Sequence, residues 1–355
     1  MATISLCMIV KNEQATLQRA LQSVKDLVDE IIVVDTGSTD STKQIALNFT
    51  QKVYDFVWCD DFSKARNFCF SKASCEYIMW LDADDVVPTN TLNYLQKIKP
   101  IMNSDCYMLK YDVSFCMGKP TYSFYRERIL KNDERCVWQG AVHECIVPYG
   151  KIEKLDVCIE HKKEKENDRN RNIKIYNKLK KQRPLNQREQ YYYSRELFDH
   201  KKYKMCISNL KKLFQMKNVW VENIIEAYYL MSQCYLCLGE REKEYECLLK
   251  TFYYDVPRAN ICCKIADYFL HNKKYTQSVY WYLLATNCKN AINSGAFVEQ
   301  RFYDYYPYMG LCCAYFYLND YKLSNEYNNK AGQVFMTKEV ESNKQLLEKY
   351  LSINN

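Results

Sequence analysis

Short apolar runs alternate with amphipathic segments over roughly the first 110 residues of the chain. The segments between the apolar runs carry signals of helices. In some, apolar side chains recur every three to four residues, and in others capping residues precede the segment. Strands that alternate with helices are typical of βαβ units around a mostly parallel sheet. The predicted strands are Ile4–Val10, Glu30–Val34, Val53–Val57 and Tyr77–Leu81, and the predicted helices are 14–27, 41–49 and 63–74.

The pattern changes beyond residue 186, where strand signals end and amphipathic helices follow one another with short loops. Segments 227–249, 266–284 and 310–331 resemble each other in their small residues and tyrosines. This is typical of tetratricopeptide helix pairs, although the spacing departs from their period of about 34 residues, and an ordinary helical bundle is the alternative. We predict an α/β domain, 1–165, a basic connecting helix, 166–185, and an all-α tetratricopeptide-like domain, 186–355.

The net charge of +7 is local, because Lys162–Arg183 holds ten Lys and Arg against three Asp and Glu. The rest of the chain is close to neutral, whereas nucleic-acid binders carry extended basic faces. We therefore expect no nucleic-acid partner and a solvated linker helix, with phosphate or acidic-peptide contact as the alternative. No apolar run approaches the ~18 residues of a membrane span, and no signal peptide is visible, so we expect a cytoplasmic protein.

The predicted fourth strand runs directly into the sequence Asp82-Ala83-Asp84-Asp85. Two carboxylates in an Asp-x-Asp triplet lie on one side of a tight turn. Mg²⁺ and Mn²⁺ prefer such oxygen donors, usually together with phosphate oxygens and water. Asp82 and Asp84 are thus candidate metal ligands, the alternative being that they cap the next helix.

A second set of polar residues follows the other strands. Glu13 comes after the first strand, Asp35 and Asp40 after the second, and Arg66 after the third. Carboxylates can accept hydrogen bonds from a nucleobase and ribose, and Arg pairs with phosphate. With no Gly-rich phosphate loop in the chain, these residues indicate a nucleotide-sugar site rather than one for ATP or a dinucleotide.

The ordered motifs resemble glycosyltransferase family 2, which has the GT-A fold. They are Cys7–Glu13, Ile31–Asp40, Asp61–Asn67 and Asp82–Asp85, and Gly140–Glu144 with His161 extends the match. The extended match is similar to a bacterial branch with a C-terminal tetratricopeptide-like domain, which includes peptide S- and O-glycosyltransferases such as the sublancin enzyme. The resemblance covers about residues 3–172.

This resemblance implies roles for individual residues. Glu13 and Asp35 would contact the nucleoside, expected to be uridine, with Arg66 near the diphosphate. Asp82 would face ribose or metal-bound water, and Asp84 would bind Mn²⁺ or Mg²⁺.

His161 would complete the metal coordination, the alternative being a strand-end imidazole without that role. An inverting transferase also needs a base that deprotonates the acceptor. Glu144 is the expected base and His143 the second candidate, while a structural His-Glu pair is the alternative.

The sequence thus predicts an inverting, metal-dependent transfer of a hexose from a UDP-sugar to an acceptor. A peptide or protein acceptor is favoured, because helical repeats form peptide-binding surfaces. The alternatives are transfer to a cell-surface glycan or lipid-linked precursor, and a tetratricopeptide scaffold with an inactive transferase domain. The helical domain could also pair two subunits into a homodimer.

Overall fold

The computed structural model describes residues 2–164, 168–290 and 298–353, which form two compact units. The first unit comprises Met1–Ser114 and Phe124–Pro184, and the second comprises Phe115–Ser123 and Leu185–Asn355. Residues 165–167, around the predicted start of the basic helix, lie outside the described residues. That helix, α5, covers Arg171–Gln182 and belongs to the first unit.

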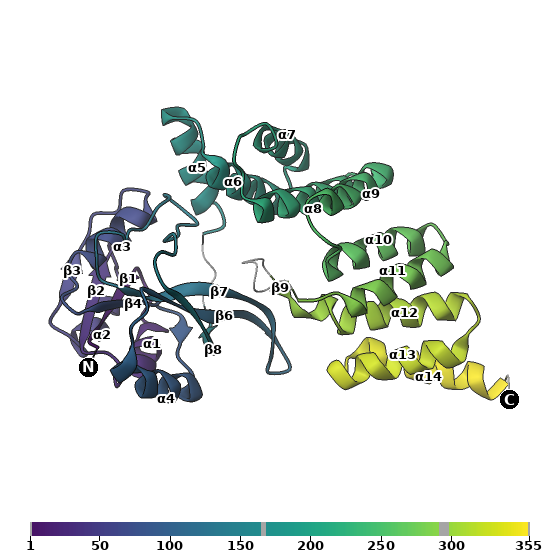
Figure 1. Ribbon diagram of the computed structural model, residues 1–355, viewed down its shortest axis with the longest axis horizontal. Helices are drawn as coiled ribbons and strands as arrows, with labels where there is room; N and C mark the ends of the chain where they lie inside the picture. The colour runs from purple at the N-terminus through teal and green to yellow at the C-terminus, as the bar shows by residue number, and fades with distance from the viewer. Residues whose placement is uncertain (1, 165–167, 291–297, 354–355) are drawn as a thin grey trace. The chain divides into compact units, whose positions relative to one another are not determined.

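A mixed sheet forms the centre of the first unit, in the order β3-β2-β1-β4-β7-β6-β8-β5 (Figure 1). The strands β1, β2, β3 and β4 are parallel, whereas β7 is antiparallel to β4, so the sheet changes direction beside β4. This confirms the predicted α/β class with a mostly parallel sheet. The strands are β1 Ile4–Val10, β2 Glu30–Asp35, β3 Val53–Asp55, β4 Tyr77–Trp80, β5 Asp85–Val86, β6 Cys106–Cys116, β7 Lys119–Lys131 and β8 Ile152–His161.

Helices cover both faces of the sheet because each central strand is apolar on both sides. In β1, Ile4, Leu6 and Met8 pack in one core with residues of α1, α2 and α4, while Cys7 packs in the opposite core with residues of α3. Because side chains on both faces of these strands are buried in a core, the strands are continuous apolar runs in the sequence. The helices are α1 Leu17–Val24, α2 Thr42–Leu47, α3 Phe62–Phe70 and α4 Thr89–Ile98, which continues as the 3₁₀ turn Lys99–Ile101.

The helices of this unit are shorter than the sequence predicted. Helix α1 begins at Leu17, because residues 13–16 form a turn in which the carbonyl of Glu13 accepts the amides of Thr16 and Leu17, at 3.1 and 2.9 Å. The predicted third strand ends early at Asp55, although the amide of Phe56 still donates to the carbonyl of Asp35 at 2.8 Å. The helix and strand types are as predicted, and the differences lie at element ends, where side-chain periodicity is least informative.

The tip of the β6–β7 hairpin, Phe115–Ser123, belongs to the second unit although it lies inside the predicted domain 1–165. There, β7 pairs with the short strand β9, Val298–Glu299, in a register that places Tyr122 opposite Glu299. Lys119 also donates to the carbonyl of Val334 at 3.3 Å. The sequence does not reveal this, because the contacts join distant positions, 215 residues apart for Lys119 and Val334.

The second unit consists of successive helix pairs (Figure 1). Tyrosines stack between helices, as in Tyr245–Tyr268 with ring centroids 4.6 Å apart and Tyr275–Tyr317 at 5.0 Å. This agrees with the predicted tetratricopeptide-like helical class. The helices are α6 Gln187–Asp199, α7 Tyr203–Leu213, α8 Val221–Cys237, α9 Arg241–Lys250, α10 Ala259–His271, α11 Tyr275–Asn287, α12 Tyr305–Tyr317, α13 Tyr321–Val334 and α14 Lys338–Ile353, with 3₁₀ turns at Thr251–Tyr253 and Gln300–Phe302.

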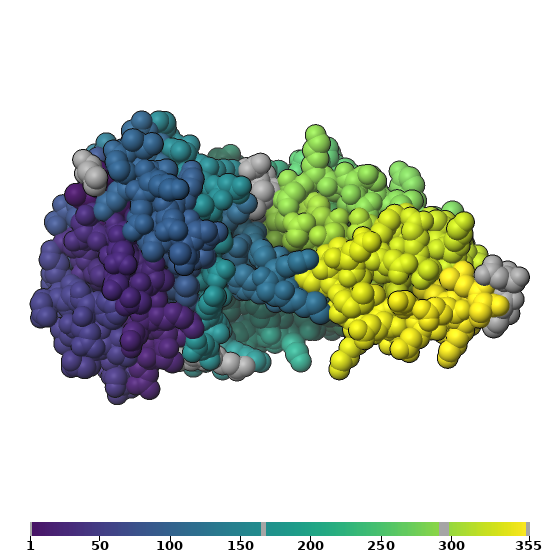
Figure 2. Space-filling view, turned by 90° about the horizontal axis from the view of Figure 1, so that it is seen from below, coloured from purple at the N-terminus to yellow at the C-terminus, as the bar shows by residue number. Residues whose placement is uncertain are grey.

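Small residues allow these helices to approach closely. Gly310 in α12 lies against the ring of Tyr282 in α11, and a Cβ at position 310 would meet that ring at 2.2 Å. The last two helices, α13 and α14, lie side by side on the face of the unit shown in yellow in Figure 2. Among the described helices, none combines the length and the apolar composition that crossing a bilayer requires.

Candidate functional site: acidic residues at the ends of the central strands

The loops after β1 and β2 are tied together by their own polar side chains. Asn12, in a left-handed conformation with φ 55°, donates its amide to the hydroxyl of Ser38 at 2.9 Å. Its side-chain oxygen accepts the amide of Thr39 at 2.7 Å. These contacts fix the loop that carries Asp35 and Asp40.

Asp35 ends β2 and is buried, with only one of its carboxylate oxygens in use. Oδ1 accepts the amides of Gly37 and Ser38, both at 2.7 Å. Oδ2 is buried and has no hydrogen-bond partner among the described residues. A buried oxygen without a donor is costly unless a ligand supplies one. This orphaned oxygen fits the nucleobase contact predicted for Asp35.

Two further predicted nucleotide contacts, Asp40 and Glu13, form hydrogen bonds within the loop itself. Asp40 accepts the amide and the hydroxyl of Thr42, the amide at 2.9 Å, and the amide of Gln14 at 3.3 Å. Although burial acts to raise it, the pKa of Asp40 is lowered by these hydrogen bonds. Glu13 donates its amide to the hydroxyl of Thr42 at 2.6 Å, and its carboxylate accepts the hydroxyl of Thr16 at 3.2 Å. Asp40 therefore holds the loop together, and its contact with the nucleotide stays a prediction.

A single guanidinium joins two of the predicted acidic residues. Arg66, in α3, donates from Nη2 to Oδ1 of Asp82 at 2.6 Å and from Nε to Oε1 of Glu144 at 2.7 Å. Its charge lies between the rings of Trp80 and Trp138, 5.1 and 4.7 Å from the ring centroids. Arg66 was expected near a diphosphate, whereas here its hydrogen bonds go to protein carboxylates. It thus fixes the distance between Asp82 and Glu144.

The charges around Asp82 keep its carboxyl group ionised. Burial alone would raise the pKa of Asp82, but the guanidiniums of Arg66 and Arg128 outweigh burial and hold this pKa at about 2. Its side chain is still 34% exposed. Asp82 therefore presents a negative charge to solvent at every pH near neutrality.

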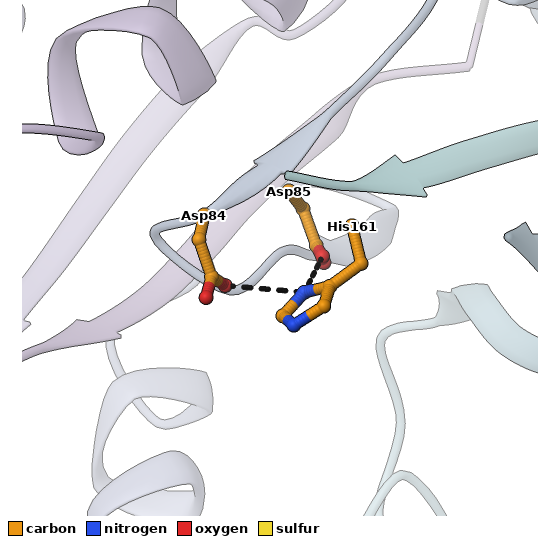
Figure 3. Close-up of side chains that lie close together, drawn as sticks. All are labelled: Asp84, Asp85 and His161. Atoms are coloured by element: carbon orange, nitrogen blue, oxygen red, sulfur yellow. Dashed lines mark hydrogen bonds and ion pairs between the residues drawn. The ribbon is translucent and has the colours of Figure 1, made fainter. Parts of the chain in front are cut away.

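Asp84 and His161 form a second pair beside Asp82, shown in Figure 3. Nδ1 of His161 lies 3.4 Å from Oδ1 of Asp84 and 3.4 Å from Oδ1 of Asp85. Burial raises the pKa of Asp84 to about 6, and Asp82 and Asp85 add to this rise, whereas His161 opposes it. Burial would lower the pKa of His161, but Asp85 and Asp84 raise it above its ordinary value.

These side chains could hold a divalent ion. Among the described residues, Asp84, Asp85 and His161 offer ligand atoms within 4.8 Å of one another. A carboxylate that is buried without an arginine partner, beside an imidazole, gains stability when a cation neutralises it. The donor set of Asp84 and His161 therefore fits Mg²⁺ or Mn²⁺. Asp82, the third predicted ligand, is not part of this cluster, and the ligand roles stay predictions.

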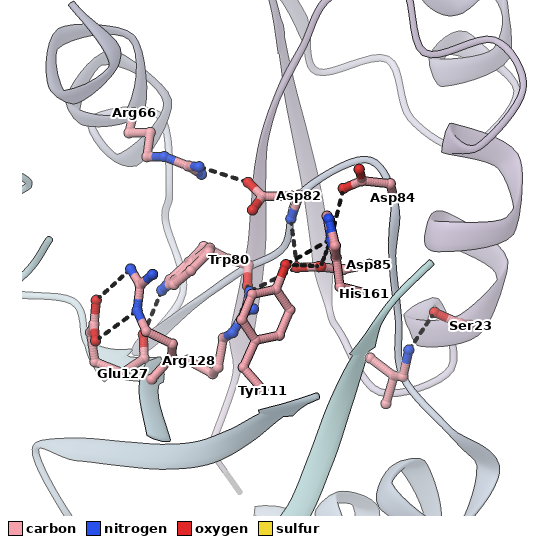
Figure 4. A network of polar contacts seen from close by, with 12 residues as sticks. Ser23, Arg66, Trp80, Asp82, Asp84, Asp85, Tyr111, Glu127, Arg128 and His161 are labelled. Carbon is pink, nitrogen blue, oxygen red and sulfur yellow. Dashed lines mark hydrogen bonds and ion pairs between the residues drawn. The ribbon is translucent and has the colours of Figure 1, made fainter. Parts of the chain in front are cut away.

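Asp85 is buried completely and differs from Asp84 in being saturated by protein donors (Figure 4). Oδ2 accepts the amide of Asp82 at 3.0 Å and Nη1 of Arg128 at 2.9 Å, and Oδ1 accepts the hydroxyl of Tyr111 at 2.7 Å. The same hydroxyl lies 2.8 Å from Nδ1 of His161. Asp85 thus positions the His161 ring. The sequence did not predict such a positioning role for Asp85, Arg128 or Tyr111.

His143 and Glu144 lie in an irregular segment of the first unit. His143 has a left-handed φ of 52°, and its ring stacks on Tyr176 of α5, with ring centroids 6.4 Å apart. Glu144 has a partly buried side chain, and its Oε2 has no hydrogen-bond partner among the described residues. Glu144 is joined to Asp82 through the Arg66 bridge.

The predicted residues therefore form two groups at one edge of the sheet. Asp35 follows β2, and Asp82 and Asp84 follow β4, with β1 between these two strands. Parallel strands are about 4.8 Å apart, so the two groups are separated by about 10 Å across the sheet. Open α/β sheets bind ligands at the carboxyl ends of their strands, where both groups lie.

Comparison with known proteins agrees with this arrangement. Residues 5–150, most of which lie in the first unit, match the family described as Glycosyl transferase family 2. The SPbeta prophage-derived glycosyltransferase SunS of Bacillus subtilis is 29% identical over 225 residues, which are 59% of this chain and 53% of that protein. A TPR repeat-containing protein of Synechococcus elongatus is 52% identical over 85 residues, which are 24% of this chain and 21% of that protein. The chain thus spans about half or less of these relatives.

A solved structure shows a more limited likeness. The crystal structure of glucosyl-3-phosphoglycerate synthase from Mycobacterium tuberculosis, in complex with Mg²⁺ and UDP, aligns with 32% of this chain and 44% of its own. The TM-score is 0.27 and the sequence identity is 24%. At this TM-score the alignment supports no conclusion about the donor or metal of this chain.

Proposed function

We propose that this chain, which contains a glycosyl transferase family 2 domain, transfers a hexose from a UDP-sugar to a peptide or protein with inversion and with Mg²⁺ or Mn²⁺ as cofactor. The observation that carries the proposal is the bridge of Arg66 between Asp82 and Glu144, at 2.6 and 2.7 Å, directly beside the pair Asp84–His161. A metal-capable pair next to a fixed carboxylate is the combination that such a transfer requires.

The nucleoside would bind at the end of β2. The orphaned Oδ2 of Asp35 can accept an N–H donor, and uracil carries one such group in its ring. Glu13, in the neighbouring loop, is the second proposed nucleoside contact. Asp40 supports this site indirectly by holding the loop through Thr42.

The diphosphate end of the donor would lie near Asp82, Asp84 and His161. Asp84 and His161 would hold the metal ion, and Asp82 would face the ribose or a metal-bound water. A bound divalent ion neutralises the charge that develops on the departing UDP. Asp85 and Tyr111 would keep the His161 ring in place during the reaction.

The acceptor would be activated by Glu144. Its Oε1 is occupied by Arg66, and its Oε2 would take the proton as the acceptor oxygen or sulfur bonds to the anomeric carbon. The bond from that carbon to the diphosphate breaks in the same step, and UDP leaves with the electron pair. Arg66 is therefore a positioning residue, and His143 is the second candidate for the base.

A peptide or protein acceptor is supported by the helical second unit, since stacked helix pairs provide surfaces for extended chains. Pairing of two subunits through this unit, predicted from the sequence, remains a prediction.

The donor reaction can be tested without knowledge of the acceptor. Wild-type protein should release UDP slowly from UDP-glucose or another UDP-hexose in the presence of Mn²⁺, and Asp84→Asn should abolish the release. Asp26→Asn, which changes an exposed aspartate in the first unit, is the matched control and should behave as wild type. Absence of metal-dependent release from every UDP-hexose would favour the scaffold alternative.

The acceptor is tested by intact-mass analysis after incubation with UDP-hexose and candidate peptides. Addition of one hexose to a Ser, Thr or Cys residue is the expected result. Donor turnover without modification of any peptide would contradict the peptide acceptor and favour a glycan or lipid-linked one.

A further inference from the structure

The helical unit contains a cavity that the transferase site does not use. It has a volume of ≈ 300 Å³ and lies among α6, α8, β9 and the part of β7 that belongs to this unit. The residues on which the argument depends are Tyr122, Tyr191, Arg195, Asp199, Glu226 and Glu299. Its volume is at the lower end of the range for ligand sites, about 300–1,000 Å³, which suits a side chain better than a whole nucleotide.

The cavity is lined by more negative than positive side chains. Three carboxylates, those of Asp199, Glu226 and Glu299, face one guanidinium, that of Arg195. Glu299 is paired with Arg301. Glu226 has no hydrogen-bond or ion-pair partner among the described residues, although it is partly buried.

Nearby charges do not neutralise Glu226. Burial raises its pKa to about 7, although Arg195 and Arg258 act to lower it. Arg258 forms a bidentate pair with Glu222 at 2.7 and 3.0 Å, so most of its charge is already compensated. A cation that entered the cavity could therefore form an ion pair with the Glu226 carboxylate, which has no such partner among the described residues.

Aromatic rings supply the rest of the lining. Tyr122, Tyr191 and Tyr229 belong to three different elements and all contribute to the cavity wall. Burial raises the pKa of Tyr122 and Tyr191 above the ordinary value, so both rings stay neutral at physiological pH. Neutral aromatic faces attract ammonium and guanidinium groups, most strongly when the cation is desolvated.

From this cavity, its aromatic wall and the unpaired carboxylate of Glu226, we propose that the helical unit binds the lysine or arginine side chain of a polypeptide. Among the described residues, the carboxylates of this cavity form no group of three metal-ligand atoms within 4.8 Å, unlike Asp84, Asp85 and His161. An anionic ligand would face three carboxylates against one guanidinium. If the bound polypeptide is the acceptor, the inference rests on the proposed function. Binding of a basic peptide segment as such does not depend on that function.

Calorimetric titration tests this on the full chain, without nucleotide. The probes are acetylated and amidated Gly-Gly-Arg-Gly-Gly, the same peptide with Lys, Gln or Glu at the centre, and free agmatine. The Arg and Lys peptides should bind, and Glu226→Gln should weaken them at least about tenfold, since hydrogen bonds to charged groups are worth ~1.5–3 kcal/mol. Glu246→Gln, an exposed change of the same kind in α9, should have no effect.

The conservative variant Glu226→Asp should retain most of the binding, which guards against a folding artefact in Glu226→Gln. Equal binding of the Gln or Glu peptide, binding of agmatine but no peptide, or unchanged affinity in Glu226→Gln would each overturn the proposal. Asp84→Asn should bind the Arg peptide as wild type does. Hence peptide binding without sugar transfer would refute the proposed function alone, and transfer without peptide binding would refute only this inference.

Discussion

Nη1 of Arg128 lies 2.9 Å from Oδ2 of Asp85, and the side chains of both residues are fully buried. The guanidinium also stacks on Trp80, 3.8 Å from the ring centroid. This ion pair anchors the turn after β4, so it connects the stability of the first unit to the geometry of Asp84 and His161.

Removal of one partner of this pair should be strongly destabilising. Arg128→Met leaves the Asp85 carboxylate buried without its cation, and the expected loss in the free energy of unfolding is about 3–5 kcal/mol. Chemical denaturation measures the loss, and hydrogen–deuterium exchange assigns it to the first unit.

The double variant Asp85→Asn/Arg128→Met should recover part of this stability, because it leaves no buried charge uncompensated. Lys110→Met breaks the exposed pair with Asp156 and should change stability by less than about 1 kcal/mol. An equally small effect for Arg128→Met would show that the pair does not anchor the turn.

Arg66 should affect turnover through the placement of Glu144 and Asp82. Arg66→Lys retains the charge but cannot donate to both carboxylates in the same planar geometry. We expect kcat for UDP-sugar turnover to fall about 10²-fold, as for displaced catalytic groups in general, with a smaller change in KM. Lys64→Met in the same helix is the exposed control. A change confined to KM for the donor would instead place Arg66 on the diphosphate.

Asp35 should determine nucleotide affinity. Asp35→Asn keeps an acceptor for the amides of Gly37 and Ser38 but replaces the orphaned Oδ2 with a donor. Calorimetry should show UDP binding at least about tenfold weaker, with Asp55→Asn as the exposed control. Unchanged UDP affinity would remove Asp35 from the nucleoside site.

Much of the first unit could be predicted from the sequence, because its motifs are local. The Asp-x-Asp turn and the loops after β1 and β2 directly follow apolar strands, so strand prediction alone brings them to one edge of the sheet. The functional contribution of Arg128 and Tyr111 was not predictable in this way. Both lie in long strands without a motif. Arg128 meets Asp85 through the antiparallel pairing of β7 with β4, and Tyr111 meets it through β8, which pairs with both β6 and β5.

Burial also changed the interpretation of charged residues. Arg66, in the helix predicted after the third strand, was expected near a diphosphate, and the structure places it between Trp80 and Trp138 with two carboxylate partners. Glu226, one of two acidic residues in α8, gave no sign that it lines a cavity. In both cases residues from distant parts of the chain form the surroundings of the side chain, and the periodicity of the sequence does not indicate such contacts.

The raised pKa of Glu226 gives the helical unit a specific pH dependence. Its pKa is about 7 in the folded protein against an ordinary value of 4.5, so its contribution to stability is complete below pH 4.5 and is lost as the pH rises to 7. Relative to wild type, Glu226→Gln should therefore gain stability across this window, by an amount on the order of 1–3 kcal/mol. Parallel unfolding curves at pH 5 and pH 8 measure the difference.

The same ionisation should govern the binding of a basic peptide. Affinity for the Arg peptide should rise between pH 6 and pH 8 as Glu226 becomes charged, with Arg195, Asp199 and Glu299 facing the same cavity. A pH-independent stability difference between wild type and Glu226→Gln would show that Glu226 is ionised like an exposed carboxylate.

Direct binding of Mn²⁺ tests the central claim, that Asp84 and His161 hold a divalent ion beside the fixed pair Asp82 and Glu144. Electron paramagnetic resonance of free Mn²⁺, recorded with UDP present, should show one bound ion per chain in wild type. Asp84→Asn and His161→Ala should each lose this binding, and Asp26→Asn should retain it. Retention of the bound ion in both Asp84→Asn and His161→Ala would contradict the account.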